Sequence, residues 1–429
     1  MAIYLSLGSN LGERRDNLRA ALAALASESV SIERLSPVVE SPALLPPDSP
    51  ADWNSPFLNL VAECSSPLAP TELLAGLKRI EHALGRDDAR HWAPRPIDID
   101  ILLFNDEIIA TDELTVPHAG LAERAFVLTP LAALRPRLEL PLAKPGRPST
   151  ALAASRSLGR VIPLWMGIVN LTPDSFSDGG NNETWPDVEN SIDTMIAGGV
   201  HLLDFGAEST RPGASLLTAK DEWSRLEPIL THAITKLADD WLRPLISVDT
   251  YHVEVAARSL ELGVDIINDV SGLTQPAMIE LAAESNASFV AMHNLGLPAD
   301  PGATLATDCG AVDQVEAWLD DQLENWQAAG IELDRIIFDP GIGFAKNPLQ
   351  SLELLRNIER FKSRGLRLLV GHSRKSFMGG FSGADRHERD LVTIGSSLAL
   401  CERGVDILRV HNVADHVTAY RGWVHTQAP

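Results

Sequence analysis

The chain has 429 residues, and 36 Lys and Arg against 58 Asp and Glu give a formal net charge of −22 at pH 7. At roughly 150 residues per domain, this length predicts two or three domains and excludes a single small binding module. The acidic balance argues against a nucleic-acid partner and against an anionic membrane surface. Hydrophobic residues make up 45% of the chain, so a sizeable folded core is expected.

The first 140 residues mix strand and helix patterns without a regular alternation. Strands are predicted at 3–7, 30–40, 57–63 and 97–104, and helices at 15–26, 70–84 and 127–134. This order is typical of an α+β domain. The proline-rich stretch that follows shows no sustained apolar period, so we predict a linker at 141–160 between domains at 1–140 and 161–429.

The second domain repeats one unit, a short apolar run followed by a helical stretch. Eight such units in about 260 residues predict a (β/α)8 TIM barrel, and an open doubly wound sheet is the alternative. Helices are predicted at 253–262, 277–284, 312–328 and 349–364 among others. Polar residues stand at or near the end of every run: Asn170, Asp204, Asp249, Asn268, His293, Asp339, His372 and His411. In a barrel these ends form the rim where active sites are built, although acids and amides there can also cap the following helices.

In the first domain, an Ile-Asp-Ile-Asp-Ile run places Asp98 and Asp100 on one face of a strand, roughly 7 Å apart. Two carboxylates so placed can hold Mg²⁺ together with substrate phosphates. Arg86, Arg95 and Arg124 in flanking segments can neutralise the charge of a phosphoryl transfer. A solvated strand face with scattered salt bridges is the alternative interpretation.

Four segments of the first domain, taken together and in order, resemble 6-hydroxymethyl-7,8-dihydropterin pyrophosphokinase. They are LSLGSNLGERRDNL, FLNLV, the GR…HWAPRPIDIDILLF block and LTVPHAGLAERAFVLTPL. The resemblance implies a ferredoxin-like α+β fold and transfer of diphosphate from ATP to the pterin, with release of AMP. It implies two Mg²⁺ on Asp98 and Asp100, and catalytic roles for Arg95 and Arg124. The remaining implied substrate residues are Gly8, Phe57, Asn59 and Phe126 for the pterin, and Glu81, Arg86, Trp92 and His118 beside ATP.

At the barrel rim, basic and hydroxyl side chains follow two of the predicted strands. Thr210 and Arg211 follow the second strand, and Lys375 follows the seventh. Such groups suit a phosphate-bearing substrate, whereas acids such as Asp249 and Asp339 can accept paired N–H donors from a flat heterocycle. The rim therefore indicates a substrate that has both features.

These rim segments, together and in order over about residues 160 to 425, resemble dihydropteroate synthase. The resemblance implies displacement of pyrophosphate from the pterin methylene by p-aminobenzoate. The implied pterin residues are Asp249, Asn268, Asp339 and Lys375, with Asp204 on the same rim; Asn170, Arg409 and His411 hold pyrophosphate or its Mg²⁺, and Thr210 and Arg211 lie near p-aminobenzoate. Relatives often carry Phe where this chain has Ile342, so a change of pocket shape and of sulfonamide affinity is expected there.

The two resemblances together identify a bifunctional folate-synthesis enzyme that uses 6-hydroxymethyl-7,8-dihydropterin, ATP and p-aminobenzoate. A pterin-binding barrel that carries folate for methyl transfer is one alternative. A kinase half that is inactive is another, because Asp87 and Asp88 stand where the kinase family has basic residues. No basic leader and no apolar run of about 18 residues is present, so a cytoplasmic protein without membrane contact is expected, and two barrels could pair as a homodimer.

Overall fold

The computed structural model describes residues 2–87, 92–141, 149–159, 162–171, 185–208, 216–296, 302–375, 377–378 and 385–427. The chain divides into two compact units. The first comprises Met1–Ile162 with Asp240–Arg243, and the second comprises Pro163–Asp239 with Pro244–Pro429. None of the helices in the described part of the chain combines the length and the hydrophobicity that crossing a membrane requires.

The first unit is built on an antiparallel sheet in the order β2-β4-β1-β5, with β3 paired to β4. Its strands are β1 (Ile3–Ser9), β2 (Ser31–Leu35), β3 (Val39–Ser41), β4 (Phe57–Ser65) and β5 (Asp98–Phe104), followed by the short pair β6 (Ile109–Ala110) and β7 (Thr115–Val116). Helices α1 (Arg14–Leu25) and α2 (Pro70–Ala83) connect them in the order βαββαβ, which is the ferredoxin-like arrangement. The predicted α+β fold is confirmed.

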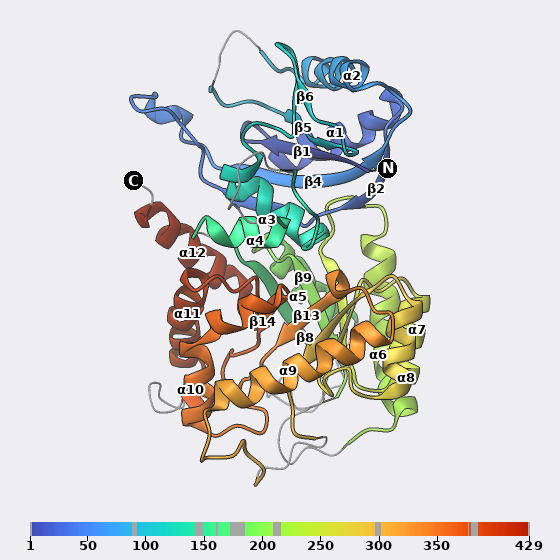
Figure 1. Cartoon of the computed structure of the whole chain (residues 1–429), viewed down its shortest axis with the longest axis vertical. Coiled ribbons are helices and arrows are strands. Elements are labelled where there is room, and N and C mark those ends of the chain that lie inside the picture. Colours follow the sequence, from blue (N-terminus) through green and yellow to red (C-terminus); the bar gives the residue numbers. More distant parts are fainter. Residues whose placement is uncertain are drawn as a thin grey trace. The chain divides into compact units, whose positions relative to one another are not determined.

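The two faces of this sheet are covered differently. Helices α1 and α2 cover one face, where Leu5 and Leu7 of β1 are fully buried (Figure 1). On the other face, α3 (Ala125–Leu134) and α4 (Ala151–Ser157) pack over Tyr4 and Leu102. They cover only part of it, because the next residues on the same face of β1 and β5 are the polar ones described below.

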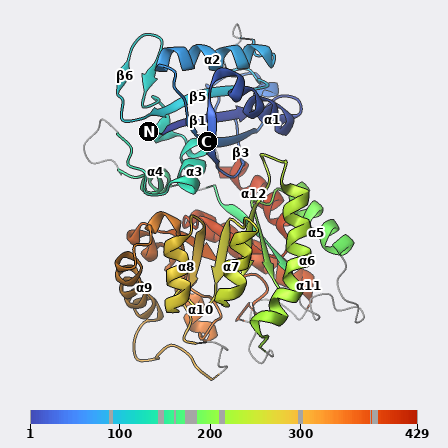
Figure 2. The ribbon, with the colours of Figure 1, turned by 90° about the vertical axis from the view of Figure 1, so that its right-hand side faces the viewer.

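The second unit is a closed barrel of eight parallel strands, in the order β10-β11-β12-β13-β14-β15-β8-β9. The strands are β8 (Leu164–Asn170), β9 (Leu202–Gly206), β10 (Leu245–Asp249), β11 (Ile266–Asp269), β12 (Ser288–Met292), β13 (Ile336–Asp339), β14 (Arg367–Val370) and β15 (Ile407–Val410). The surrounding helices are α5 (Trp185–Ala197), α6 (Ala219–Leu237), α7 (Val253–Glu261), α8 (Pro276–Glu284), α9 (Ala311–Ala328), α10 (Pro348–Arg356), α11 (Arg386–Glu402) and α12 (Val413–Gln427) (Figure 2). The predicted TIM barrel is confirmed.

Three predicted elements differ in detail. The strand expected at 30–40 is two strands, β2 and β3, because the chain breaks its ladder at Ser36 and Pro37; the Val61 N–H donates to the Ser36 hydroxyl at 2.9 Å instead. The helix expected at 349–364 ends at Arg356, and after Asn357 the chain continues as a 3₁₀ helix, Ile358–Arg364. Within the segment predicted as a linker, α4 forms and buries its apolar residues against α3.

Candidate active sites

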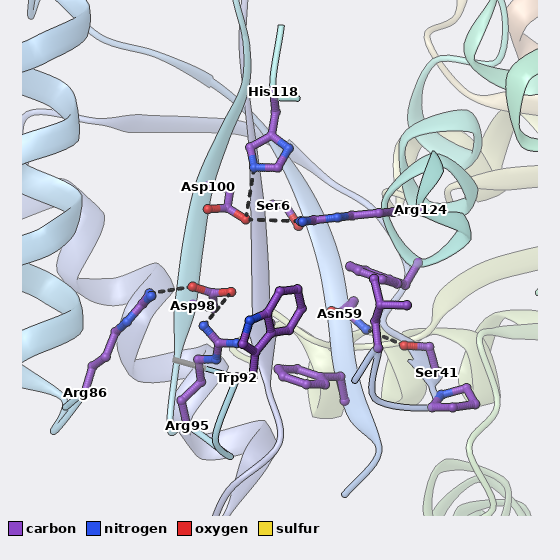
Figure 3. Close-up of a pocket in the computed structure, with 15 residues that line it drawn as sticks. Ser6, Ser41, Asn59, Arg86, Trp92, Arg95, Asp98, Asp100, His118 and Arg124 are labelled. Atoms are coloured by element: carbon purple, nitrogen blue, oxygen red, sulfur yellow. Dashed lines mark hydrogen bonds and ion pairs between the residues drawn. The ribbon is translucent and has the colours of Figure 1, made fainter. Parts of the chain in front are cut away.

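The first unit contains a pocket of about 290 Å³ on the uncovered part of its sheet. Figure 3 shows its side chains, which come from β1, β3, β4, β5 and the loops around them. Its lining comprises Ser6, Gly8, Ser41, Pro42, Leu44, Phe57, Asn59, Arg86, Trp92, Arg95, Asp98, Asp100, His118, Arg124 and Phe126. Every candidate residue of this domain except Glu81 therefore lies in one pocket.

Strand register places the polar floor of this pocket. Gly8 of β1 lies opposite Asp98 of β5 on one side and opposite Asn59 of β4 on the other, and Ser6 lies opposite Asp100. Alternation along β5 points the two aspartates into the pocket while Ile99 and Ile101 are buried on the helical face. The two carboxylates thus share one face, as the Ile-Asp alternation predicts.

Four basic side chains surround the two carboxylates (Figure 3). Arg86 pairs with Asp98, and the Arg95 Nη1 lies 3.4 Å from the second oxygen of the same carboxylate. The His118 Nε2 lies 3.7 Å from Asp100 Oδ2, and the Arg124 Nη1 lies 3.9 Å from the same oxygen. Two carboxylates with basic groups around them are an arrangement that can hold a metal ion together with phosphates.

Burial and like charge set the protonation of this pair. Burial and the neighbouring Asp98 carboxylate raise the pKa of Asp100. Burial lowers the pKa of His118, so the neutral imidazole is favoured. Since its Nδ1 accepts a hydrogen bond of 3.0 Å from the Gly120 N–H, the proton of the neutral ring lies on Nε2, facing Asp100. The histidine is thus oriented as a donor into the pocket.

Glu81 differs from its expected place beside ATP. This residue of α2 is fully buried and does not line the pocket, and burial raises the pKa of its carboxyl group. Its oxygens accept hydrogen bonds from the Ile99 N–H at 2.6 Å and from the Lys78 ammonium at 2.7 Å, and it pairs with Arg86. A carboxylate held in this way anchors β5 to α2 and orients Arg86, instead of meeting phosphates that carry its own sign of charge.

Aromatic side chains and an asparagine amide line the rest of this pocket. Phe57 and Phe126 lie beside the guanidinium groups of Arg95 and Arg124, at 6.0 and 5.9 Å from ring centre to guanidinium carbon. The Asn59 amide donates to the Ser41 hydroxyl at 3.0 Å. A methyl group at Gly8 would come within 2.9 Å of the Asn59 Oδ1, so a residue without a side chain keeps this end open. Ser41 was not foreseen, because its strand could not be separated from the neighbouring Pro-rich loop by pattern alone.

In the barrel, one arginine joins the acidic side chains of two strands. Arg409 of β15 donates through Nε to the Asp204 Oδ2 at 2.6 Å and through Nη2 to the Asp249 Oδ2 at 2.8 Å. Asp204 also accepts from Asn268 at 3.1 Å and from the Ser247 hydroxyl at 2.6 Å. The barrel mouth is therefore a connected polar network, in which Ser247 is a member that sequence reasoning missed.

The two oxygens of the Asp249 carboxylate differ in their partners. Its Oδ1 is buried and has no hydrogen-bond partner among the described residues, whereas its Oδ2 is used by Arg409. Burial, together with the nearby Asp204 and Asp269, raises the pKa of Asp249 to about 7. An unpartnered acceptor in a buried site is costly unless a ligand donates to it. This oxygen can accept a hydrogen bond from an N–H donor of a ligand.

Lys375 and Asp339 lie at the same mouth. Burial lowers the pKa of Lys375 to about 8, against the opposing effect of the Asp339 carboxylate. The ammonium donates to the Ile342 carbonyl and lies 4.2 Å from the centre of the Phe344 ring. The Ile342 side chain is fully buried in the barrel core, and its carbonyl meets the lysine. The change of pocket shape expected at this position stays a prediction.

The remaining rim residues divide between the mouth and the helical layer. The His411 Nδ1 lies 3.0 Å from the Ser373 hydroxyl, and Asn170 is half-buried at the end of β8. His293 and His372 point away, because His293 meets Lys346 at 2.9 Å and His372 meets Ser397 of α11 at 3.0 Å. The two expected residues near p-aminobenzoate, Thr210 and Arg211, lie outside the described residues.

Comparisons with known proteins match each domain separately and the chain as a whole. Residues 4–136 match the family 7,8-dihydro-6-hydroxymethylpterin-pyrophosphokinase, and residues 166–411 match the family described as pterin binding enzyme. The folate synthesis bifunctional protein of Chlamydia caviae is 39% identical over 96% of this chain and 95% of its own. The mitochondrial folate synthesis bifunctional protein of Pisum sativum is 36% identical over 98% of this chain and 88% of its own.

Solved structures match the barrel. A dihydropteroate synthase of Xanthomonas albilineans with 4-aminobenzoic acid is 34% identical, with a TM-score of 0.56, and the match covers 62% of this chain and 94% of that one. A dihydropteroate synthase of Anaplasma phagocytophilum with bound 6-hydroxymethylpterin-monophosphate is 35% identical, with the same TM-score, over 62% of this chain and all of that one. At 34% and 35% identity, both matches indicate a family relationship in addition to a shared fold.

Proposed function

The chain belongs to the family of folate synthesis bifunctional proteins, which join a pterin pyrophosphokinase to a dihydropteroate synthase, and we propose how its residues divide the two reactions. In the first, the hydroxymethyl oxygen of 6-hydroxymethyl-7,8-dihydropterin attacks the β-phosphorus of ATP. The bond from that phosphorus to the oxygen that bridges it to the α-phosphorus breaks, AMP leaves, and the hydroxyl group loses its proton. In the second, the amine of p-aminobenzoate attacks the pterin methylene carbon, pyrophosphate leaves, and the amine loses a proton, which gives 7,8-dihydropteroate.

The acidic pair in the first domain fits Mg²⁺. Asp98 and Asp100 offer oxygen ligands from one strand face, and basic groups beside them match the remaining charge of a nucleotide. Mg²⁺ held by these two residues would offset the charge that develops on the phosphate oxygens. Asn170 alone offers one amide oxygen, so in the barrel Mg²⁺ would be held mainly by the substrate pyrophosphate.

The basic groups of the first pocket would bind the phosphates. Arg95 and Arg124 would turn from the carboxylates towards the triphosphate, and His118 would donate through Nε2 to a phosphate oxygen. Glu81 would act on Arg86 without touching substrate. Because phosphoryl transfer needs alignment and charge neutralisation, no covalent intermediate on the protein is required.

The aromatic end of the pocket would hold the pterin. Phe57, Phe126 and Trp92 offer apolar surfaces for a flat ring, and the Asn59 amide offers hydrogen bonds at its edge. Gly8 keeps the space between them open. This arrangement would place the hydroxymethyl group towards the acidic pair, where the phosphates lie.

In the barrel, the orphan Asp249 oxygen supports a pterin site. Asp249, Asn268 and Asp339 would face the N–H and carbonyl groups of the ring, and Lys375 would lie beside it. Arg409 and His411 would contact pyrophosphate, with Arg409 shared between that anion and its present partners Asp204 and Asp249. Thr210 and Arg211 would lie near p-aminobenzoate.

The observation that carries the proposal is the convergence of two acids, four basic groups and three aromatic side chains on one pocket. The test incubates the full chain with the pterin alcohol, ATP, Mg²⁺ and p-aminobenzoate, and follows AMP and dihydropteroate. A parallel reaction receives the pterin pyrophosphate directly. Both products in the first mixture are expected. Dihydropteroate formed only in the second would mean an inactive kinase half, and neither product in either would favour the methyl-carrier alternative.

Some finer points stay predictions with their own measurements. A cytoplasmic location is predicted, whereas the pea relative is named as mitochondrial, so fractionation of the source cells decides. Light scattering of the purified chain decides whether barrels pair as a homodimer. A sulfonamide complex is recorded for the Yersinia pestis synthase, and competition between a sulfonamide and p-aminobenzoate would show whether this barrel is also a target.

A further inference from the structure

A second group of metal-ligand residues lies in the barrel, outside the residues assigned to either reaction. Glu208 follows β9, Glu222 lies in the first turn of α6, and His252 immediately precedes α7. One carboxylate oxygen of each glutamate and one ring nitrogen of the histidine all lie within 4.8 Å of one another. Three segments separated along the chain thus meet at one point, beside the helices α6 and α7 that Figure 2 shows next to each other.

The three side chains face one another closely. The His252 Nε2 lies 3.6 Å from the Glu208 Oε2 and 3.9 Å from the Glu222 Oε2. The glutamate side chains are only 3% and 1% exposed. The Nε2 atom is itself buried and makes no hydrogen bond with any described residue. Buried polar atoms usually have a hydrogen-bond partner. This ring nitrogen, which faces two buried carboxylates, could instead act with them as a metal ligand.

Two hydroxyl groups orient the carboxylates from behind. Tyr251 donates to the Glu208 oxygens at 3.0 and 3.2 Å, and Thr250 donates to the Glu222 Oε2 at 3.0 Å. Such outer hydrogen bonds are common around metal ligands, since they hold the ligand in one orientation. Within the described part of the chain, the only ion pairs of Glu208 and Glu222 are those with His252.

The charge of the cluster also favours a cation. Burial and the negative charges of Glu208 and Asp249 raise the pKa of Glu222 to about 8. Two buried carboxyl groups close together are unfavourable when both are ionised, unless a positive charge lies between them. A bound divalent ion would remove that penalty and would displace the proton from Glu222.

The spacing suits a small divalent ion. Zinc binds imidazole nitrogen and carboxylate oxygen at about 2.0–2.2 Å, so the ligand atoms of a tetrahedral site lie about 3.3–3.6 Å apart. The observed 3.6 and 3.9 Å between the imidazole nitrogen and the two carboxylates need to close by only a few tenths of an ångström, and the two carboxylates lie within 4.8 Å of each other. We propose that Glu208, Glu222 and His252 form a binding site for a divalent transition-metal ion such as Zn²⁺, separate from the Mg²⁺ positions of the two reactions.

The proposed ion has room for a further ligand. His252 and Tyr251 also line a pocket of about 540 Å³ with Gln275 and Asn294. Three protein ligands leave one tetrahedral position for water or for a small anion from this pocket. Bound to segments that follow β9 and β10, the ion would stabilise the rim next to Asp249. The proposal does not depend on the assigned reactions.

The experiment uses the full chain and three variants, Glu222→Gln, His252→Gln and, as a matched control, Glu254→Gln, which alters a neighbouring acid in the same pocket wall. All four are prepared with Asp98→Asn, so that the predicted kinase metal site does not contribute. Zinc is added, excess is removed by gel filtration, and the retained metal is measured by mass spectrometry. Visible absorption of bound Co²⁺ reports ligation by imidazole, and circular dichroism checks the fold.

We expect about one tightly held Zn²⁺ in the parent and in Glu254→Gln, and binding at least about 100-fold weaker in the other two, because a direct ligand is lost. The absorption of bound Co²⁺ should be lost or altered in His252→Gln and in Glu222→Gln, whereas the parent and Glu254→Gln should give the same spectrum. Equal zinc retention in folded parent, Glu222→Gln and His252→Gln would overturn the proposal. So would a folded parent that retains no zinc, which would mean that the three side chains share only a proton.

Discussion

The pH dependence of the synthase reaction is the sharpest test of the barrel mouth. Asp249 has a raised pKa of about 7 and Lys375 a lowered pKa of about 8, both chiefly through burial. If the reaction needs ionised Asp249 and protonated Lys375, activity rises through the first pKa as the pH increases and falls through the second. The product of the two fractions is greatest near pH 7.5 and falls about sixfold at pH 6 and at pH 9.

The assay supplies the pterin pyrophosphate directly and measures kcat/KM for dihydropteroate formation from pH 5.5 to 9.5, since this ratio reports the free enzyme. Lys375→Arg keeps the positive charge to a far higher pH, so its alkaline limb should disappear while its acid limb stays. The kinase reaction of the same chain serves as the control for general inactivation. A flat profile, or an alkaline limb unchanged in an active Lys375→Arg, would refute the assignment.

Three further changes test other parts of the two sites. Asp98→Asn removes one acidic metal ligand at nearly constant volume, so AMP formation should fall at least about 1000-fold while dihydropteroate formation from supplied pyrophosphate is unchanged; equal AMP formation would remove the metal assignment. Gly8→Val should raise the KM for the pterin alcohol at least about tenfold, because its Cβ already comes within 2.9 Å of the Asn59 Oδ1, whereas an unchanged KM would place the pterin elsewhere. Arg409→Met leaves two carboxylates without their cation and should destabilise the barrel by about 3–5 kcal/mol, measured by calorimetry; an unchanged barrel transition would contradict this.

The first domain shows how one sheet face can serve both packing and chemistry. Tyr4 and Leu102 lie under α3 and α4, while Ser6 and Asp100 on the same strands and the same face line the pocket. The register of β1 and β5 shifts between Tyr4 and Leu5, at the boundary between the two parts. The polar part of the face lines the pocket because α3 and α4 pack over the apolar part alone.

The acidic residues of the two sites have their charge compensated in different ways. Asp98 and Asp100 lie in an open pocket beside arginines, where we propose that they hold a metal ion and meet phosphates. Asp204, fully buried in the barrel, has its charge balanced by Arg409 and accepts two further hydrogen bonds. The arginines of the first site can leave the carboxylates when a metal ion and phosphates bind. In the second site, Arg409 holds both Asp204 and Asp249 in place, so that the Asp249 Oδ1, which has no partner among the described residues, keeps a fixed position.

Local periodicity by itself determined much of this protein. A strand repeats every two residues, so the alternation at Asp98 and Asp100 was enough to place both on one face. Eight apolar runs alternating with helical stretches were enough for the barrel, since parallel strands joined by helices close in this number, and polar residues at the strand ends marked its mouth. Each of these inferences depends only on residues close together in the sequence.

Tertiary packing decided the rest, because local patterns do not say what covers a side chain. Glu81 is buried against Arg86 and the backbone of β5. His372 meets Ser397 of α11, and His293 contacts Lys346, which precedes α10, and Trp318 of α9, although both histidines follow strands as the other rim residues do. The partners of Arg409 lie 160 and 205 residues away in the chain. Such contacts arise only when the barrel closes, and they set which charges are paired and which remain for substrate.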